Sequence, residues 1–334
     1  MVIKCKNWKP SPKPLHGICK AGKLGGEPVV SACIDVCGQC QNSSEDFRNY
    51  LSSRFGTGKM AADNKKVIIE SQPQRHRAWH KDVFYRGDGT TVDLVDLFHG
   101  QSVFLICNGP SIKDIDLEKL TSTPGVMTMS LNNGGHKIRT NLWTGQDPPY
   151  RFMQSIWEDP SIMKFTLYDY RKRPVWDRKK GGYSDLKLWQ CPNTFFHKRH
   201  SDFDAKKWLD EDKVVWGEPK DAGGNRSVML AALHILYFLG FRNVFLLGAD
   251  FHMTSDDKYF FEDRAAVKHN NRLFKNVAKY LEQLKPYLNE VGFRVFNCSP
   301  ASHLKVFEHK SIHDAVEMCR VNISQSTEGM YVKR

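Results

Sequence analysis

The sequence predicts an α/β fold: a doubly wound, mostly parallel, Rossmann-like sheet with a small Cys-rich segment at the N-terminus. From Val103 onward, short runs rich in β-branched and aromatic residues alternate with helical segments, the pattern of strands joined by crossover helices. Several of these runs end in glycine together with amide or acid side chains, and open α/β sheets bind ligands beyond the carboxyl ends of their strands. The expected parts are a metal-binding segment (1–45), a connector (46–100), the Rossmann-like domain (101–320) and a tail (321–334).

The composition is that of a globular chain with a basic balance. Its 334 residues are 40% hydrophobic, enough for a sizeable core, and the net charge is +12 at pH 7. Such a charge favours anionic partners such as nucleotides, nucleic acid or acidic glycans, and solubility alone is the other explanation. No apolar run approaches the ~20 residues of a membrane span, and residues 1–30 lack the apolar core of a secretory signal. We therefore expect a cytoplasmic protein without a membrane span.

Five of the nine cysteines fall in the first 40 residues. In a cytosolic chain such a cluster indicates a bound metal more than disulfides, and the surrounding Pro- and Gly-rich sequence cannot build an apolar core without a staple. The spacing matches no standard zinc-finger template, so both zinc and an iron–sulfur cluster stay open. The expected ligands are Cys5, Cys19, Cys33, Cys37 and Cys40.

The rest of the chain is arranged around residues 102–116, SVFLICNGPSIKDID. Its apolar start predicts a buried strand, which turns through Asn-Gly-Pro-Ser into the N-terminus of a helix. Gly109 lets a ligand approach the backbone closely, and Ser111 offers a hydroxyl near the unpaired amides of that helix. Because those amides and the helix dipole favour an anion, we expect Asn108, Gly109 and Ser111 to bind a phosphate. An ordinary capped β–α turn is the alternative.

Three more strands are predicted, over residues 126–130, 141–145 and 163–168. Polar side chains follow the first two, at the edge where the carboxyl ends of parallel strands meet. One such residue would be a turn former, but several at one edge indicate a binding site. These residues are Asn132, Asn133, Gln146 and Asp147.

Residues 170–187 are strongly basic, with seven Lys and Arg side chains among Tyr170, Trp176 and Tyr183. Aromatic residues interleaved with cations suit nucleic acid or another polyanion. Runs of charge are more often solvated loops, which is the alternative here.

Residues 221–250 predict a buried helix followed by a central strand. Asn225 or Ser227 can cap the helix, and residues 228–239 are apolar on nearly every side, so the helix should be buried. His234, in its middle, is more typical of a packed core histidine than of a ligand.

The central strand, over residues 244–247, ends at Gly-Ala-Asp. That ending places Asp250 and His252 where the other strand ends converge, so both are candidate catalytic residues. A last strand is predicted over residues 293–296 and ends at Asn-Cys-Ser-Pro.

The longest predicted helix covers residues 264–284, with Pro286 just beyond its end. Asn270 begins an apolar stripe with helical spacing that should be buried. His269 lies beside it near the start of the helix, so its ring is expected to reach the loop edge of the sheet, near Asp250 and Asn108.

Together these motifs resemble the bacterial family 42 sialyltransferases and the related Rossmann-like family that includes archaeal 6-hydroxymethylpterin diphosphokinase. The resemblance covers roughly residues 102–316 and rests on NGPS, LGADF, the histidine of the long helix and NCSP. It implies a nucleotide-binding transferase domain that uses a nucleotide-sugar or another nucleotide donor. The residues implicated by resemblance are Asn108, Gly109, Ser111, Asn132, Ser227 and Tyr259 for the nucleotide, and His269 as the catalytic histidine.

The chain departs from that family at one position of the site. The family has a Tyr directly after its Asp-Phe pair and a second Tyr several residues on, which hold the donor phosphate. Here His252 takes the first position, and Tyr259 matches the second. Sialic acid is therefore not implied as the donor sugar.

The leading hypothesis is a glycosyltransferase in which His269 takes the proton from an acceptor hydroxyl, as an imidazole can near neutral pH. His252, Tyr259 or Arg226 would stabilise the charge on the leaving nucleotide. No D-x-D motif stands at a strand end, and a Mg²⁺ ion stays open. Two alternatives remain: a diphosphokinase that uses ATP and Mg²⁺, and a nucleic-acid-binding protein whose function lies in the basic segment and the cysteines.

Overall fold

The computed structural model describes residues 82–218, 224–256, 259 and 267–319, and the backbone of four short strands near the N-terminus. The chain divides into two compact units, one of Met1–Pro73 with Ile323–Arg334 and one of Gln74–Asn322.

The four N-terminal strands form two antiparallel pairs. They are β1 (Trp8–Pro10) with β2 (Gly17–Cys19), and β3 (Lys23–Leu24) with β4 (Glu27–Pro28). Of the expected metal ligands, Cys5, Cys33, Cys37 and Cys40 lie outside the described residues, and Cys19 is described only by its backbone at the end of β2. Metal binding by these cysteines stays a prediction.

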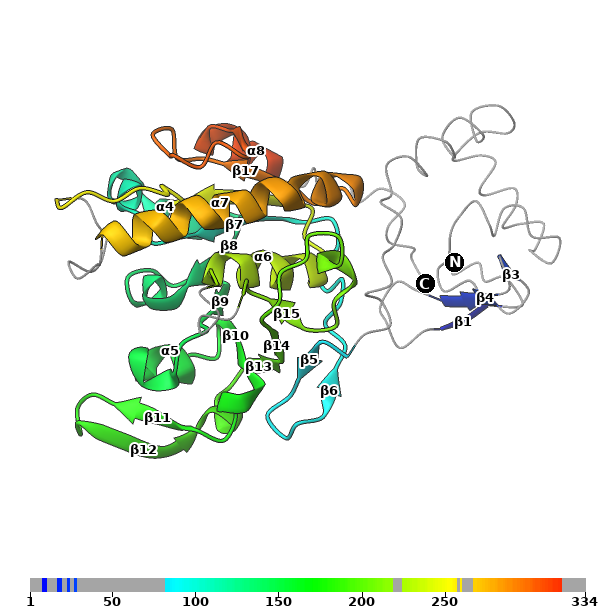
Figure 1. The fold of residues 1–334 in the computed structure, drawn as a ribbon. Coiled ribbons are helices and arrows are strands. Elements are labelled where there is room, and N and C mark those ends of the chain that lie inside the picture. The colour runs from blue at the N-terminus through cyan, green and yellow to red at the C-terminus, as the bar shows by residue number, and fades with distance from the viewer. Residues whose placement is uncertain are drawn as a thin grey trace, which may run out of the picture. The chain divides into compact units, whose positions relative to one another are not determined.

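The larger unit is built on a sheet to which the described residues contribute ten strands (Figure 1). Neighbouring strands are parallel from β18 through β13, and only the edge strands β5 and β6 are antiparallel. In sheet order the strands are β18 (Glu308–His309), β17 (Arg294–Asn297), β16 (Asn243–Leu247), β7 (Ser102–Ile106), β8 (Met127–Leu131), β9 (Leu142–Thr144), β10 (Met163–Leu167), β13 (Thr194–His197), β5 (Phe84–Tyr85) and β6 (Thr91–Val92). The predicted α/β fold with a mostly parallel sheet is confirmed.

All six strands predicted from residue 102 onward are present, within one or two residues of their expected bounds. The strands of this sheet that were not predicted are β5, β6, β13 and β18, and three of these have only two residues, too few to show a period. Strands β5 and β6 lie in the region that the sequence presents as a connector.

Helices cover both faces of the sheet (Figure 1). On one face, α6 (Val228–Phe238) and α7 (Val267–Glu290) pack on Val103 and Leu105 of β7. On the other, α4 (Leu117–Ser122) and α8 (Ile312–Cys319) pack with Phe104 and Ile106. This alternation follows from the two-residue period of a strand, and it explains why β7 is apolar throughout: both of its faces are buried.

The remaining described elements are short. They are α5 (Gln154–Glu158), the 3₁₀ turns η2 (Pro110–Asp114), η3 (Asn132–His136), η4 (Pro149–Arg151), η5 (Tyr168–Tyr170), η6 (Leu188–Gln190) and η7 (Trp208–Asp210), and the strand pairs β11 (Pro174–Asp177) with β12 (Gly182–Lys187) and β14 (Arg199–His200) with β15 (Val214–Val215).

Helix α6 matches its prediction. Nine of its eleven residues are buried, and the Ser227 hydroxyl caps it by accepting a hydrogen bond from the Met229 amide (3.2 Å). His234 is a packed core residue, as expected: its Nδ1 accepts from the Val215 amide (2.9 Å), and its ring stacks on Trp208.

Pro286 lies inside α7 and not beyond its end, so the predicted helix end is wrong. A proline inside a helix costs about 3 kcal/mol. However, the apolar stripe runs from Leu284, before the proline, to Leu288, after it, and both side chains are buried. Burying a leucine contributes about 1.5–3 kcal/mol, so one further turn of packing offsets most of the cost.

The basic segment forms the antiparallel hairpin β11–β12. Trp176 lies opposite Tyr183 across it, with the two rings perpendicular and their centroids 5.0 Å apart. Asp177 accepts hydrogen bonds from the amides of Lys179 and Lys180, which closes the turn and leaves both lysine side chains exposed. Polyanion binding by this hairpin stays a prediction.

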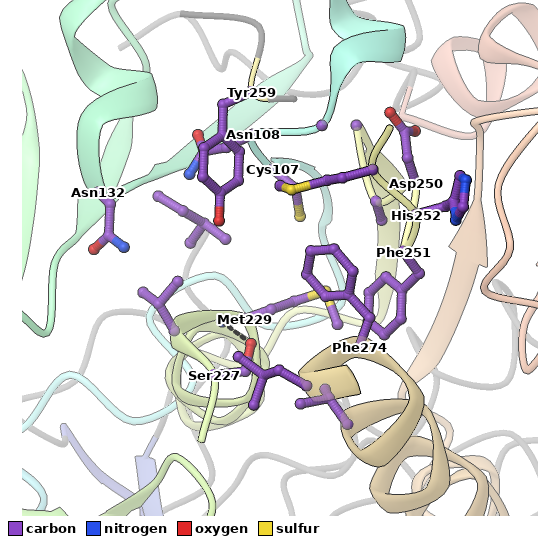
Figure 2. A pocket seen from close by; sticks show the side chains of 18 of the residues that line it. Cys107, Asn108, Asn132, Ser227, Met229, Asp250, Phe251, His252, Tyr259 and Phe274 are labelled. Atoms are coloured by element: carbon purple, nitrogen blue, oxygen red, sulfur yellow. Dashed lines mark hydrogen bonds between the residues drawn. The ribbon is translucent and has the colours of Figure 1, made fainter. Parts of the chain in front are cut away.

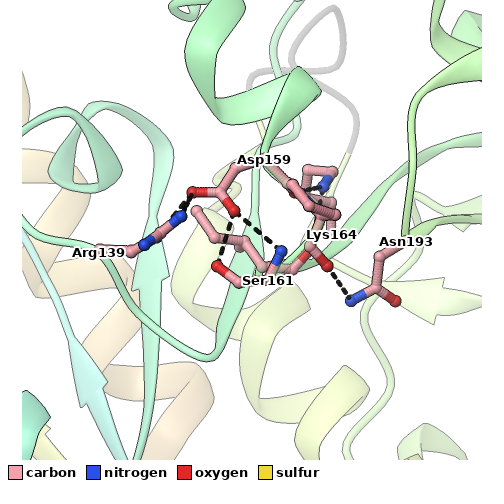
Figure 3. A network of polar contacts seen from close by, with 7 residues as sticks. Arg139, Asp159, Ser161, Lys164 and Asn193 are labelled. Atoms are coloured by element: carbon pink, nitrogen blue, oxygen red, sulfur yellow. Dashed lines mark hydrogen bonds and ion pairs between the residues drawn. The ribbon is translucent and has the colours of Figure 1, made fainter.

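The amino ends of β9 and β10 are closed by a polar network (Figure 3). The Asp159 carboxylate accepts from Arg139 Nε (2.7 Å) and from the backbone N and Oγ of Ser161 (2.9 and 2.7 Å). The buried Lys164 Nζ donates to the backbone oxygens of Asp159 (2.6 Å) and Ile162 (2.9 Å). Burial lowers the pKa of Lys164 to about 8. This network fixes the edge of the sheet opposite to the carboxyl ends of the strands.

A second buried titratable group, His197, lies at the carboxyl end of β13. Its Nδ1 lies 3.3 Å from the Lys198 carbonyl oxygen, and its Nε2 lies 3.2 Å from Gln146 Nε2. Burial lowers the pKa of His197 to about 4, so the ring is neutral in the folded protein at neutral pH.

We expect the free energy of unfolding to fall as the pH is lowered from about 7 to about 5. The folded-state pKa of His197 is depressed to about 4, whereas the unfolded chain has a value of about 6.5. The unfolded chain therefore binds a proton in this interval that the folded protein does not, which disfavours folding by about 2 kcal/mol. Urea unfolding at both pH values, for the wild type and for His197→Asn, measures this contribution.

The variant should lose about 2 kcal/mol of the pH dependence, whatever its stability at neutral pH. Burial also lowers the pKa of His136, to about 4, so part of the dependence should persist in the variant. An unchanged pH dependence in His197→Asn would contradict the prediction.

Candidate functional site

A cavity lies at the carboxyl edge of the sheet, at the point where the strand order reverses. From β7 the chain proceeds through β8, β9 and β10 on one side, and β16 later takes the other side of β7. In doubly wound sheets this reversal separates the loops after the two central strands and leaves a crevice for ligands. Here residues 107–109, after β7, and residues 248–253, after β16, both line the cavity.

The cavity has a volume of about 190 Å³ (Figure 2). An engineered apolar cavity of about 150 Å³ holds one benzene molecule, so this one has room for a single ring. Its apolar wall comes from the end of β8, the start of α6, the loop after β16 and α7, and includes Leu131, Met229, Phe251, Met253, Leu273, Phe274 and Val277. The polar groups come from the same elements and from Tyr259.

Eight of the residues predicted from the sequence line this cavity. They are Asn108, Gly109, Asn132, Arg226, Ser227, Asp250, His252 and Tyr259. Figure 2 shows Asn108, Asn132 and Tyr259 on one side and Phe251 and Phe274 on another, with Met229 between. The convergence expected for the ends of parallel strands is therefore present for these residues.

Two asparagine side chains at the cavity have unused acceptors. Asn108 Oδ1 and Asn132 Oδ1 are buried and have no hydrogen-bond partner among the described residues. A buried acceptor without a donor costs about 1–3 kcal/mol, which a ligand N–H or O–H group would recover. A Cβ at Gly134 would lie 2.7 Å from Asn108 Oδ1, so a glycine is needed beside that oxygen.

Two residues of the cavity have left-handed backbone conformations. Asn132 has φ +46°, which asparagine tolerates, and its carbonyl accepts from Trp143 Nε1 (2.8 Å). Phe251 has φ +55°, which is a strained conformation for a bulky residue. The conformation brings its ring to Phe274, with the ring centroids 5.3 Å apart. Strain of this kind is concentrated at functional sites.

The anion at the start of η2 is a side chain of the protein itself. Asp250 Oδ2 accepts from the Ser111 amide (2.8 Å), and Oδ1 accepts from Ser111 Oγ (2.5 Å). Ser299 Oγ lies 3.2 Å from Ser111 Oγ and accepts from the Gly248 amide (3.1 Å). Ser111 is therefore engaged by Asp250 and does not line the cavity, and phosphate binding by Ser111 stays a prediction.

Gly109 lines the cavity, but it is needed first for packing within the protein. Its amide donates to the Gly248 carbonyl (2.9 Å), and a Cβ would lie 2.5 Å from both that oxygen and Asp250 Oδ2. In this structure, the atoms that closely approach Gly109 therefore belong to the loop after β16 of the protein itself.

His252 lies at the mouth of the cavity and is exposed. Its ring stacks on that of His303, with the centroids 4.4 Å apart and the planes 12° from parallel. The His303 amide donates to the Asp250 carbonyl (2.8 Å). On the other side, Asn271 holds both backbone groups of Met253 through its side-chain amide, at 2.9 Å each. Neither His303 nor Asn271 was predicted from the sequence, and the only signal for Asn271 is its place beside Asn270 near the start of the long helix.

His269 does not reach the cavity, which corrects its expected position. Its side chain is exposed, and it lines a separate surface hollow with Val267, Lys268 and Arg272. Successive helical residues point about 100° apart, and Asn270 is the residue that faces the site, with its Nδ2 3.4 Å from the Tyr259 hydroxyl.

The other predicted residues also lie outside the cavity. Gln146 is buried and donates its amide to Thr144 Oγ1 (3.2 Å), beside His197, while its Oε1 has no partner among the described residues. Asp147 pairs with Arg151 (3.0 Å). Asn133 Oδ1 is also buried and has no partner within the described ranges, like Oδ1 of Asn108 and of Asn132, but Asn133 does not line the cavity.

The described residues contain no group of three or more His, Cys, Asp or Glu side chains placed to hold a metal ion. Within the same part of the chain, no helix has the length and apolar character needed to cross a membrane.

No family model and no curated protein match the chain. Among solved structures it is similar to the crystal structure of a mammalian sialyltransferase in complex with Gal-beta-1-3GalNAc-ortho-nitrophenol. The TM-score is 0.35 and the identity 13%, over 70% of this chain and 85% of that one. A similarity of this extent supports no inference about function, and the resemblance to the bacterial family 42 sialyltransferases stays a prediction.

Replacing Asp250 by alanine should lower the free energy of unfolding by about 1–3 kcal/mol, because the Ser111 amide and hydroxyl lose their acceptor. Asp250→Asn should cost less, since its remaining oxygen still accepts from the amide. Urea unfolding measures both variants. Asp256→Ala, at an exposed carboxylate of the same loop, is the matched control and should change stability by no more than about 0.5 kcal/mol. Equal stabilities for Asp250→Ala and the control would contradict the bracing role.

Proposed function

We propose that this chain is a nucleotide-dependent transferase, most directly a glycosyltransferase that moves a sugar from a nucleotide-activated donor to an acceptor hydroxyl. The observation that carries the proposal is the ring-sized cavity at the strand-order reversal, because open α/β sheets bind nucleotides at this point. The motif resemblance stated above favours the same class.

The cavity suits the nucleoside end of such a donor. Phe251, Phe274 and Met229 offer apolar surface for the faces of a ring. The unused oxygens of Asn108 and Asn132 can accept hydrogen bonds from an exocyclic amine or from ribose hydroxyls. A cavity of about 190 Å³ does not hold a whole nucleotide-sugar, so the phosphates and the sugar would extend through the mouth.

The mouth supplies the group for proton transfer. We propose His252 as the general base: it would take the proton of the acceptor hydroxyl as the acceptor oxygen bonds to the anomeric carbon. The bond between that carbon and the phosphate oxygen breaks, and the nucleotide leaves with the electron pair. Asp250 acts as a positioning residue, because both of its carboxylate oxygens accept hydrogen bonds from Ser111. The acceptor is proposed to be acidic, a nucleic acid or an anionic glycan, which would suit the exposed lysines of the β11–β12 hairpin.

Nucleotides or nucleotide-sugars should raise the melting temperature of the protein, since a ligand that binds only the native state stabilises it by mass action. Asn132→Ala should weaken the binding of the stabilising ligand by several-fold to about tenfold, because one hydrogen bond is lost. Thermal shift with the common nucleotides, ATP included, identifies the ligand, and calorimetry measures the change.

Asn193→Ala is the matched control, because Asn193 has nearly the same backbone conformation (φ +47°) but is exposed and far from the cavity lining. It should bind as the wild type does. Absence of any shift with all nucleotides would refute the proposal.

With a donor and acceptor in hand, His252→Ala should lower kcat by about 10²–10⁴-fold with little change in nucleotide affinity. His252→Phe keeps a ring against His303 but cannot take a proton, so it should be equally slow. His269→Ala, on the exposed start of α7, should keep its activity. The opposite result would return the role of base to His269 and leave the transferase assignment intact.

A further inference from the structure

Two arginines stack on one buried tryptophan beside the cavity. Arg199 Cζ lies 3.8 Å and Arg226 Cζ 4.5 Å from the centre of the Trp216 ring. Trp216 is buried, and its Nε1 donates to Ser201 Oγ (3.1 Å), which fixes the plane of the ring. Arg226 lines the cavity itself, whereas Arg199 follows β13 at the same edge of the sheet.

The backbones that carry these side chains are held in place. Arg199 pairs with Val214 where β14 meets β15, and Arg226 is bridged to Gly217. Next to that bridge, the Ser227 amide donates to the Trp216 carbonyl (2.8 Å). The arrangement therefore exists before any ligand arrives, which lowers the entropy cost of binding.

Among the described residues, neither arginine of the pair has an ion-pair partner. Burial lowers the pKa of Arg199, and the charge of Arg226 adds to this, while Tyr170, Asp169 and Asp147 act in the opposite direction. Two half-buried like charges are unfavourable unless an anion joins them.

We propose that Arg199 and Arg226, stacked on Trp216, bind a phosphate group of a substrate. The guanidinium fork matches phosphate oxygens in a bidentate geometry, and stacking on an aromatic face orients the fork without using its N–H donors. Arg226 is a member of the arginine pair and also lines the ring cavity. A phosphate attached to a ring in the cavity would therefore contact Arg226 before Arg199.

The phosphate can come from either of two substrates. Where it is the phosphate of the nucleotide donor, this inference rests on the proposed function. The second source is a phosphate ester on the other substrate, over the ends of β9, β10 and β13, where Arg199 lies. The shared chemistry is a phosphate ester, and competition between probes separates the two sources.

The experiment compares the four ribonucleosides, their 5′-diphosphates and inorganic pyrophosphate by calorimetry on the full chain. We expect the best diphosphate to bind the wild type at least about tenfold more tightly than its nucleoside, with an affinity that falls as salt is raised. Arg199→Gln and Arg226→Gln should each lose most of this gain and leave nucleoside affinity nearly unchanged. Arg294→Gln, at an exposed arginine that lies over the Phe296 ring at the start of β17, is the matched control and should keep the gain.

Melting curves show whether the glutamine variants fold. If either does not, Arg199→Lys and Arg226→Lys replace them; these keep the charge but lose the fork, and should lose part of the gain. If pyrophosphate competes with the nucleoside diphosphate, the arginine pair binds the phosphate of the donor. If pyrophosphate and the diphosphate bind at the same time, the arginine pair binds the phosphate of the second substrate.

The remaining outcomes separate the two proposals. Pyrophosphate that binds the wild type but not the glutamine variants, with no binding of any nucleoside or nucleotide, would refute the proposed function and keep the phosphate site. Two results would overturn the phosphate site and leave the ring cavity in place. In the first, the glutamine variants fold and still bind the diphosphate more tightly than the nucleoside by the wild-type factor. In the second, the wild type binds nucleosides but binds their diphosphates no more tightly. A wild type that binds none of the probes would refute both.

Discussion

The candidate site depends on one interaction, the acceptance of two hydrogen bonds from Ser111 by the carboxylate of Asp250. It joins the turn after β7 to the loop after β16, and Ser299 adds the loop after β17 through Ser111 Oγ and the Gly248 amide. The first two loops form much of the cavity wall. The same network supports the left-handed conformation of Phe251, the residue directly after Asp250, because such strain persists only where surrounding contacts over-determine it.

Asparagines at this edge of the sheet fall into two kinds. Asn271 uses both ends of its amide on Met253, and Asn297 accepts from the Ser299 amide and donates to the Leu304 carbonyl. Asn108 and Asn132 instead keep a buried oxygen that has no donor in the part of the chain that the structure describes. A satisfied amide stabilises a loop, whereas an unsatisfied one is tolerated only at a cost of the order of 1 kcal/mol or more. This difference, and not the presence of asparagine, separates the bracing residues from the candidates for ligand binding.

Six of the ten strands, the buried helix α6 and the convergence of the NGPS and LGAD turns could be predicted from sequence, because apolar runs and parallel pairing determine them. The hydrogen bonds between Asp250 and Ser111 could not be predicted, because they depend on the conformations of two loops that follow strands far apart in the chain. The prediction that His269 faces the site was wrong by one residue, since Asn270 faces it instead. One step along a helix turns a side chain by about 100°. The stacking of Arg199 and Arg226 on Trp216 leaves no periodic signal in the sequence.

The ring cavity and the arginine pair are joined through Arg226. The bridge between Gly217 and Arg226 is followed directly by Ser227, which caps α6, and α6 packs in the core against β7. The distance between the two sites is therefore set by a helix, a strand and the bridge. A molecule that fits both sites gains from each contact but loses its translational and rotational freedom only once. A rigid spacing of this kind selects for a substrate in which a ring and a phosphate are covalently joined at a fixed separation, and it disfavours either group alone.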